Sequence, residues 1–161
     1  MVRLLAAVTV GVLMLGSVVS VWAGEKAKDA LIDLMRSDIR AERIAIITEV
    51  MDFTEEEASV FWPVYQRYER EQRKINDQRV ELIKQYGENY FDMDDGTARH
   101  IVKTWVELDI KESYMKKKYF RRFEWVLPTI KAAKFMQLEN QINLLIRLQI
   151  AAELPMLEEW K

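Results

Sequence analysis

The chain has 161 residues, and its 24 basic and 26 acidic side chains give a formal net charge of −2. A chain this close to balance lacks the positive field with which many proteins hold nucleic acid, so we expect no nucleic-acid partner. It contains no cysteine. This excludes disulfides, thiolate metal sites, thiol catalysis and a lipid anchor attached to cysteine, so stability must come from helix packing and apolar burial.

Residues 1–23 have the pattern of a secretory signal peptide. Arg3 precedes an almost wholly apolar run from Leu4 to Val21, and Val21 and Ala23 supply short side chains where a signal peptidase reads the chain. The sequence therefore predicts cleavage before Gly24 and a single domain, residues 24–161, in the bacterial periplasm. The alternative is an uncleaved membrane anchor, because the run nearly reaches the roughly 20 residues that span a bilayer.

The rest of the chain is predicted to be all-α. Glycine and proline are sparse, helix formers dominate, and no run keeps the alternation of a strand. Apolar residues recur at spacings of three and four in four segments. The first runs from Lys26 to about Met51, and the second, opened by a capping box of Thr54 and Glu57, from Glu55 to about Tyr86 or Gly87. After a loop from Glu88 to Asp94, Asp94 or Asp95 can cap the third, which extends to about Val126. The fourth has Pro128 in its first turn and stops before Pro155. The two long middle helices predict an antiparallel hairpin flanked by shorter helices. A hairpin this thin cannot bury all of its apolar surface within one chain, so we expect a homodimer.

In the second, third and fourth predicted helices, the apolar residues that share one face form a stripe that we expect to face the core. The stripe of the second helix includes Phe61, Val64, Tyr68, Ile75, Leu82 and Tyr86. The stripe of the third helix is Ala98, Ile101, Trp105, Leu108, Met115, Tyr119, Phe123 and Val126, and Glu112 interrupts it. The stripe of the fourth helix is Phe135, Leu138, Ile142, Leu145, Leu148 and Ala152.

Two aromatic residues near Pro63 lie off these stripes. Trp62 and Tyr65 could pack on a neighbouring helix or await a ligand. Pro63 lies inside the second helix and predicts a bend there and no break, because the apolar pattern continues in phase on both sides.

Enzymatic and metal-binding functions find little support. His100 is the single histidine, and no glycine-rich phosphate loop or HExxH motif is present. Asp92, Asp94 and Asp95 cluster in a predicted loop without the spacing of a calcium-binding loop. Met93 and His100 are two weak ligands and do not make a metal site. We therefore expect no catalytic residue, no cofactor and no metal site.

The segment 116–122 is the most basic part of the chain, with five cations around two aromatic residues. One interpretation is a solvated helix face whose lysine stems cover apolar surface. The other is a partner-binding surface that attracts acidic, unfolded or membrane-bound partners. The candidate partner-binding residues are Lys116, Lys117, Tyr119, Arg121 and Arg122.

Several short motifs together resemble the Spy/CpxP superfamily of bacterial periplasmic helical proteins, which is marked by Leu-Thr-x-x-Gln motifs. The matching segments are Phe53–Glu57, the run Glu57–Tyr65 with its Phe-Trp-Pro-Val-Tyr core, Leu127-Pro128, and Gln137-Leu138-Glu139-Asn140. Phe53 and Glu57 replace the Leu and Gln of the first motif, and Pro128 and Lys131 stand where the second has Thr and Gln. The motif residues are Phe53, Thr54, Glu57, Phe61, Trp62, Pro63, Tyr65, Leu127, Pro128, Gln137, Glu139 and Asn140.

The resemblance implies a curved, often dimeric helical cradle that binds non-native proteins without ATP. It implies as an alternative an envelope-stress adaptor, or a metal-responsive partner of a membrane sensor protein. Our first hypothesis is therefore a periplasmic chaperone-like protein that binds unfolded or envelope proteins, and the adaptor is the second.

Overall fold

The computed structural model of the chain describes residues 40–157. The chain divides into two units, residues 1–42 and 43–161, and the account below concerns the second. The predicted signal peptide, and the predicted helix before residue 40, lie outside the described residues. Residues 40–51 are helical. Within the described part of the chain, no helix is both long and apolar enough to cross a membrane.

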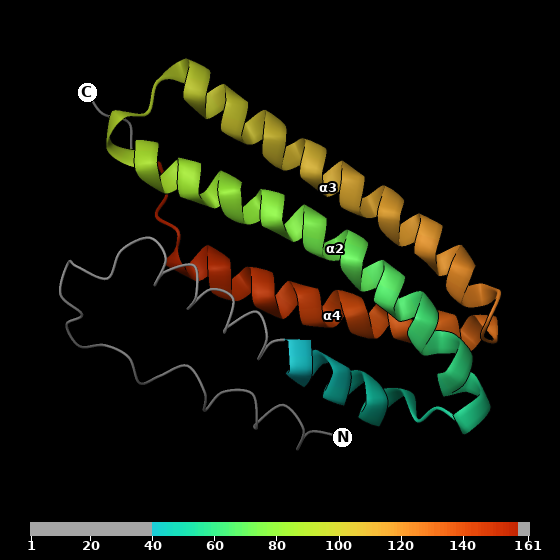
Figure 1. Ribbon diagram of the computed structural model, residues 1–161. Helices are drawn as coiled ribbons and strands as arrows, with labels where there is room; N and C mark the ends of the chain where they lie inside the picture. Colours follow the sequence, from blue (N-terminus) through green and yellow to red (C-terminus); the bar gives the residue numbers. More distant parts are fainter. Residues whose placement is uncertain (1–39, 158–161) are drawn as a thin grey trace, which may run out of the picture. The chain divides into compact units, whose positions relative to one another are not determined.

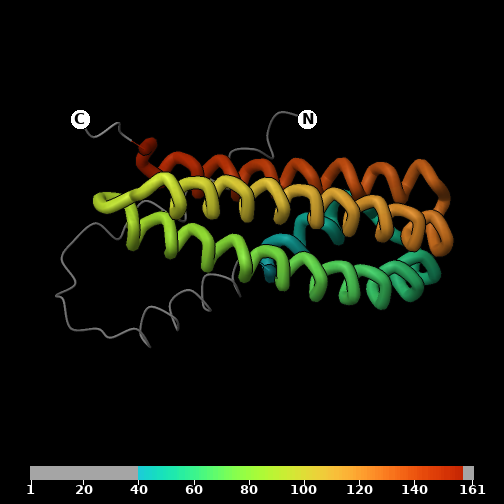
Figure 2. The backbone as a smooth tube through the Cα atoms, turned by 90° about the horizontal axis from the view of Figure 1, so that it is seen from above, coloured from blue at the N-terminus to red at the C-terminus, as the bar shows by residue number. Residues whose placement is uncertain are grey.

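Three long helices follow: α2 (Glu55–Asn89), α3 (Asp95–Glu124) and α4 (Thr129–Glu153), with a short 3₁₀ turn, η1 (Tyr90–Asp92), before α3. No strand occurs among residues 40–157, so the all-α prediction is confirmed. Figures 1 and 2 show α3 running back along α2, and α4 returning along α3. The bounds of α2, α3 and α4 agree with the predicted ones to within a few residues.

The start of α2 is fixed by a reciprocal cap. The Thr54 hydroxyl accepts a hydrogen bond from the Glu57 backbone N–H at 3.2 Å, and the Glu57 carboxylate accepts one from the Thr54 backbone N–H at 3.0 Å. This is the capping box that the sequence predicts, and it satisfies two N–H groups that would otherwise lack partners. Asp52 has a φ of 46°, a left-handed conformation that a short polar residue tolerates and that ends the helix before it.

The connections are tighter than expected. The segment predicted as a loop, Glu88 to Asp94, instead completes α2 and forms η1, and Asp94 caps α3 by accepting a hydrogen bond from the Thr97 N–H at 2.7 Å. Pro128 is predicted to lie in the first turn of the fourth helix, but it is the N-cap of α4, and the helix begins one residue later at Thr129. Its ψ of 139° is extended. α2 continues through the exposed Pro63 without a break, as expected.

An aromatic cluster forms the core where α2, α3 and α4 meet. The buried ring of Phe61 lies 5.4 Å from that of Phe123 on α3 and 5.0 Å from that of Phe135 on α4. Tyr65 is buried, and Trp62 is half-buried and packs edge-on against it at 5.4 Å. Tyr65 also packs on a neighbouring helix, with its ring 6.0 Å from that of Phe135 on α4. Trp62 packs against the same core.

The predicted core stripe of α4 is wrong over the second half of the helix. Leu145 and Leu148 are exposed, and the buried positions are Glu139 and Asn143. α4 is turned so that Phe135 and these two polar side chains face the interior. Burying polar groups requires partners, and those partners lie on other helices.

Candidate protein-binding surface

A buried polar cluster joins α4 to the helical residues 43–51 and to α2. The Arg43 guanidinium donates to the Glu139 carboxylate and, at 2.9 Å, to the Asn143 side-chain oxygen. The Tyr68 hydroxyl donates to the same Glu139 oxygen at 3.2 Å. Burial raises the pKa of the Tyr68 phenol well above its usual range, and the Glu139 charge raises it further. The hydroxyl therefore stays protonated and remains a donor.

A second polar cluster joins α2, α3 and α4 further along. Glu112 is the residue that interrupts the predicted core stripe of the third helix. Its carboxylate accepts hydrogen bonds from Arg79 on α2 at 3.0 Å and from Arg147 on α4. Lys116 lies 2.8 Å from its other oxygen. Arg79 also donates to Asp109 at 3.0 Å, and Arg147 lies 3.6 Å from the same oxygen. Three cations and two carboxylates thus converge where the helices pass one another.

The charges around Glu112 hold its carboxyl group ionised. Burial alone would raise the pKa of this group, but the Lys116 hydrogen bond and the charges of Lys116, Arg147 and Arg79 outweigh it and hold the pKa below its usual value. A charge buried this deeply is tolerated because each neighbouring helix supplies a cation. The arrangement links α2, α3 and α4 through the Glu112 carboxylate.

The five candidate partner-binding residues do not form one surface. Tyr119 is buried in the core, Lys116 is paired with Glu112, and Arg122 lies over the Tyr119 ring at 4.9 Å. Lys117 and Arg121 are exposed and make no ion pair with any described residue. The structure thus brings some of the five into the packing and leaves two at the surface.

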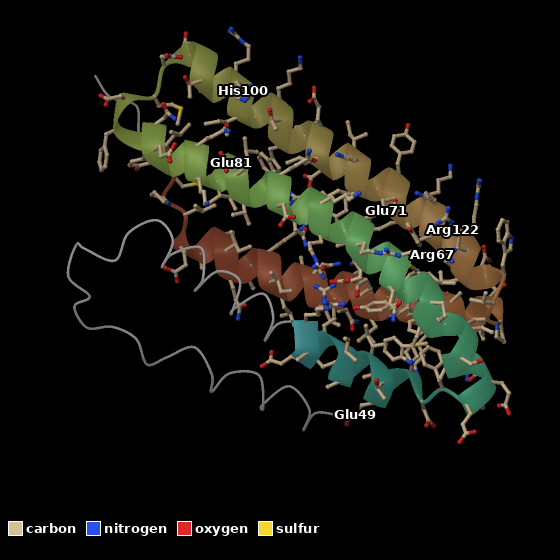
Figure 3. All side chains as sticks on the ribbon, viewed as in Figure 1. Glu49, Arg67, Glu71, Glu81, His100 and Arg122 are labelled. Atoms are coloured by element: carbon tan, nitrogen blue, oxygen red, sulfur yellow. The ribbon has the colours of Figure 1, made fainter. Side chains whose placement is uncertain are left out.

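Glu71 of α2 pairs with Lys118, another cation of the basic segment. Its carboxylate accepts hydrogen bonds from Lys118 at 2.7 Å and from the Tyr119 hydroxyl at 2.8 Å. Burial opposes ionisation of Glu71, but these hydrogen bonds hold its pKa below the usual value. Burial and the Glu71 carboxylate raise the pKa of Tyr119 to about 12. Figure 3 shows Glu71 of α2 with Arg122 of α3 and Arg67 near it.

Several of the motif residues take part in helix capping or in core packing. Glu57 accepts a hydrogen bond from Lys131, which ties the start of α2 to α4, and this bond lowers the pKa of Glu57. Leu127 is buried in the turn between α3 and α4, whereas Gln137 and Asn140 are exposed. The motifs therefore supply caps, the aromatic core and the buried Glu139, and the structure does not gather them into one site.

A groove lined by residues of α2 and α3 has a volume of about 580 Å³. Glu81 of α2 and His100 of α3 line it, as labelled in Figure 3, and its floor includes Leu82 and Leu108. Within residues 40–157, no group of three or more histidine or acidic side chains could hold a metal ion.

The clearest exposed apolar surface is on α4. Leu144, Leu145 and Leu148 form what we call the α4 patch, and Leu144 and Leu148 are 63% and 65% exposed. Arg147 is the only charged residue between Glu139 and Glu153, and it turns toward α3. The apolar pattern predicted Leu145 and Leu148 in the core. This segment is apolar nearly all round, however, so one buried face cannot hold all its leucines.

The predicted core stripe of α3 is wrong at Trp105. This side chain is 52% exposed. It lies one turn before Asp109, whose carboxylate is 3.6 Å from Arg147 of α4. An aromatic side chain thus stands partly in solvent on α3.

A second apolar row lies on α3. Val102, Val106 and Ile110 recur every four residues and form what we call the α3 stripe, and each is about half exposed. A shallow groove of about 360 Å³ beside it is lined by Val106, Asp109, Ile110, Ser113, Tyr114 and Lys117. Exposed apolar surface of this extent on a helix pair is typical of protein contact sites.

Comparisons of the chain with protein families, with curated proteins and with solved structures find no match.

Proposed function

We propose that this chain is a chaperone-like protein of the bacterial periplasm that binds apolar segments of non-native or envelope proteins without ATP and without enzymatic activity. The observation that carries the proposal is the α4 patch. Its leucines stand in solvent on a helix whose buried face is fixed by Glu139 and Asn143, so the helix cannot turn to hide them. Large apolar side chains that stay in solvent contribute no burial energy to the fold, and a group of them on one surface is typical of a protein contact site.

The patch suits extended apolar segments. Leu144, Leu145 and Leu148 offer an uncharged apolar surface on one helix. Shallow contacts of this kind are weak individually and tolerate many sequences, which suits a protein that binds varied clients. The predicted export signal places this binding where ATP is not available to drive release.

An aggregation assay tests the proposal. Reduced α-lactalbumin is allowed to aggregate with increasing amounts of the protein, and light scattering is followed. We expect suppression near stoichiometric ratio, and a loss of most of it in the variant Leu144→Glu/Leu148→Glu. The matched control is Val60→Glu, which places the same charge at an exposed apolar position of α2. The absence of suppression by the unaltered protein in large molar excess would refute the proposal.

Crosslinking in intact cells separates the chaperone from the alternative envelope-stress adaptor. A broad distribution of crosslinked proteins, reduced by Leu144→Glu/Leu148→Glu, supports the chaperone. One discrete membrane protein in place of that distribution supports the adaptor and overturns the chaperone.

A further inference from the structure

Two arginine residues lie level with each other where α2 and α3 run antiparallel. The register of the two helices is fixed there by Lys118 of α3, which donates a hydrogen bond to Glu71 of α2 at 2.7 Å. Four residues before Glu71 is Arg67, and four residues after Lys118 is Arg122. Residues spaced by four share one face of a helix, so the same register brings Arg67 and Arg122 to one level. Figure 3 shows both side chains near Glu71.

Among the described residues, no carboxylate forms an ion pair with either guanidinium group. Arg67 is exposed and Arg122 is half-buried. The Arg122 guanidinium lies over the Tyr119 ring at 4.9 Å, and cation–π attraction favours this position. Two positive charges near each other repel, and an anion between them replaces this repulsion with attraction.

The three acidic residues nearest in sequence to these arginines are not available to them. The Glu71 carboxylate accepts hydrogen bonds from Lys118 and, at 2.8 Å, from the Tyr119 hydroxyl. Glu69 and Glu124 each lie two residues from one of the arginines, which is about 200° around an α-helix and therefore on its other side. The two guanidinium groups thus keep their donors for a ligand.

The phenol of Tyr119 shows that the two arginine charges act at one place. Burial raises the pKa of this phenol, the hydrogen bond and charge of Glu71 raise it further, and the charges of Arg122 and Arg67 act in the opposite direction. One hydroxyl group therefore lies in the field of both guanidinium groups, although they come from different helices.

From this geometry we propose that Arg67 and Arg122 bind a phosphate group, carried either by free phosphate or by a lipid headgroup. A phosphate monoester bears about two negative charges near neutral pH and three acceptor oxygens, so it can engage both guanidinium groups. A carboxylate has a single charge and two oxygens, which one arginine satisfies. Lys118 and Arg121 add positive charge on the neighbouring positions of α3. The site is separate from the α4 patch, so the proposal does not rest on the proposed client binding.

Titration with inorganic phosphate tests the site, with calorimetry as the readout and chloride used to hold the ionic strength constant. Arg67→Gln and Arg122→Gln should each weaken phosphate binding by about tenfold, because each removes a charged pair of donors. Arg122→Lys keeps the charge but loses the planar pair of N–H donors, so it should recover only part of the affinity.

The matched control is Arg99→Gln. It removes an exposed cation of the same helix, about 35 Å from Arg122 along its axis, and should change phosphate binding by less than about twofold. Circular dichroism of each variant checks that the helices are intact. Equal losses in Arg99→Gln and Arg122→Gln would overturn the proposal, because phosphate would then respond only to the overall charge.

Vesicles distinguish the two sources of the phosphate group. Phosphatidylcholine vesicles containing phosphatidic acid present a phosphate monoester at their surface, and vesicles of phosphatidylcholine alone are the blank. Binding of these vesicles but not of free phosphate, lost in Arg67→Gln, identifies a lipid headgroup, and the reverse result identifies free phosphate. Binding of neither overturns the proposal. Tighter binding of polyglutamate than of either phosphate form, also lost in Arg67→Gln, would show that the site takes acidic protein segments and that the phosphate assignment is wrong.

Discussion

The hydroxyl group of Tyr68 on α2 donates a hydrogen bond at 3.2 Å to the carboxylate of Glu139 on α4, a side chain with no exposed surface. The same carboxylate pairs with Arg43, which lies before the start of α2. One buried charge thus links three helical segments that are distant in the sequence. Its energetic cost is offset only while each of these partners is in place.

Glu139→Gln should destabilise the fold by about 3 kcal/mol, because it leaves the largely buried Arg43 guanidinium without a charge partner. The measurement is the free energy of unfolding from urea titration. The control is Glu107→Gln, whose pair with Lys103 is exposed at 3.9 Å and should change stability by less than about 0.5 kcal/mol.

The double variant Arg43→Met/Glu139→Met removes both charges of the pair. It should be more stable than Glu139→Gln, because no uncompensated charge remains and an apolar side chain can replace the ion pair. A double variant as unstable as the single one would contradict the view that the unpaired charge causes the loss.

Acid should destabilise the protein partly through Glu112. The pKa of Glu112 is lower in the folded chain than the ordinary value of 4.5. Its stabilising contribution is therefore complete above that value and is lost as the pH falls through the lower, folded pKa. The difference in unfolding free energy between the unaltered protein and Glu112→Gln should be largest near neutral pH and should shrink on acidification.

Urea midpoints measured from neutral pH to strongly acidic pH check this dependence, with Glu107→Gln as the exposed control. A difference between Glu112→Gln and the unaltered protein that stays constant or grows toward acid would contradict the assignment.

Phe61→Ala should cost about 4 kcal/mol, since it removes a fully buried ring that contacts aromatic rings on α3 and α4. The neighbouring variant Val60→Ala alters an exposed position of the same helix turn and should stay within about 0.5 kcal/mol of the unaltered protein. Thermal or urea unfolding measures both. Similar losses in the two variants would mean that this helix face is not packed as described.

The sequence predicted the helices well because their signals are local. The capping box of Thr54 and Glu57, the cap at Asp94 and the proline at 128 each act within a few residues, so a linear reading of the chain finds them. The aromatic core was also predictable, since Phe61, Tyr68 and Phe123 keep the helical period.

The rotation of α4 was not predictable in the same way. An apolar pattern assigns leucines to the core, and nothing near Glu139 shows that Arg43 and Tyr68, 96 and 71 residues away, satisfy its carboxylate. The same long-range pairing exposes Leu145 and Leu148 and so creates the α4 patch. The ion pairs of the basic segment could not be predicted for the same reason, because Glu71 and Glu112 come from outside it.

The contrast between the short α3–α4 turn and the distant Arg43 has a consequence for folding kinetics. Trp125 to Pro128 join two helices that can meet soon after they form, since closing a short loop costs little chain entropy. Arg43 must find Glu139 across most of the domain, so this contact should form after the rate-limiting step. Removing both charges should therefore change mainly the unfolding rate and leave the folding rate nearly unaltered, as the two arms of a chevron plot would show. The Arg43 contact would then govern how long the folded chain persists and would have little influence on how fast it forms.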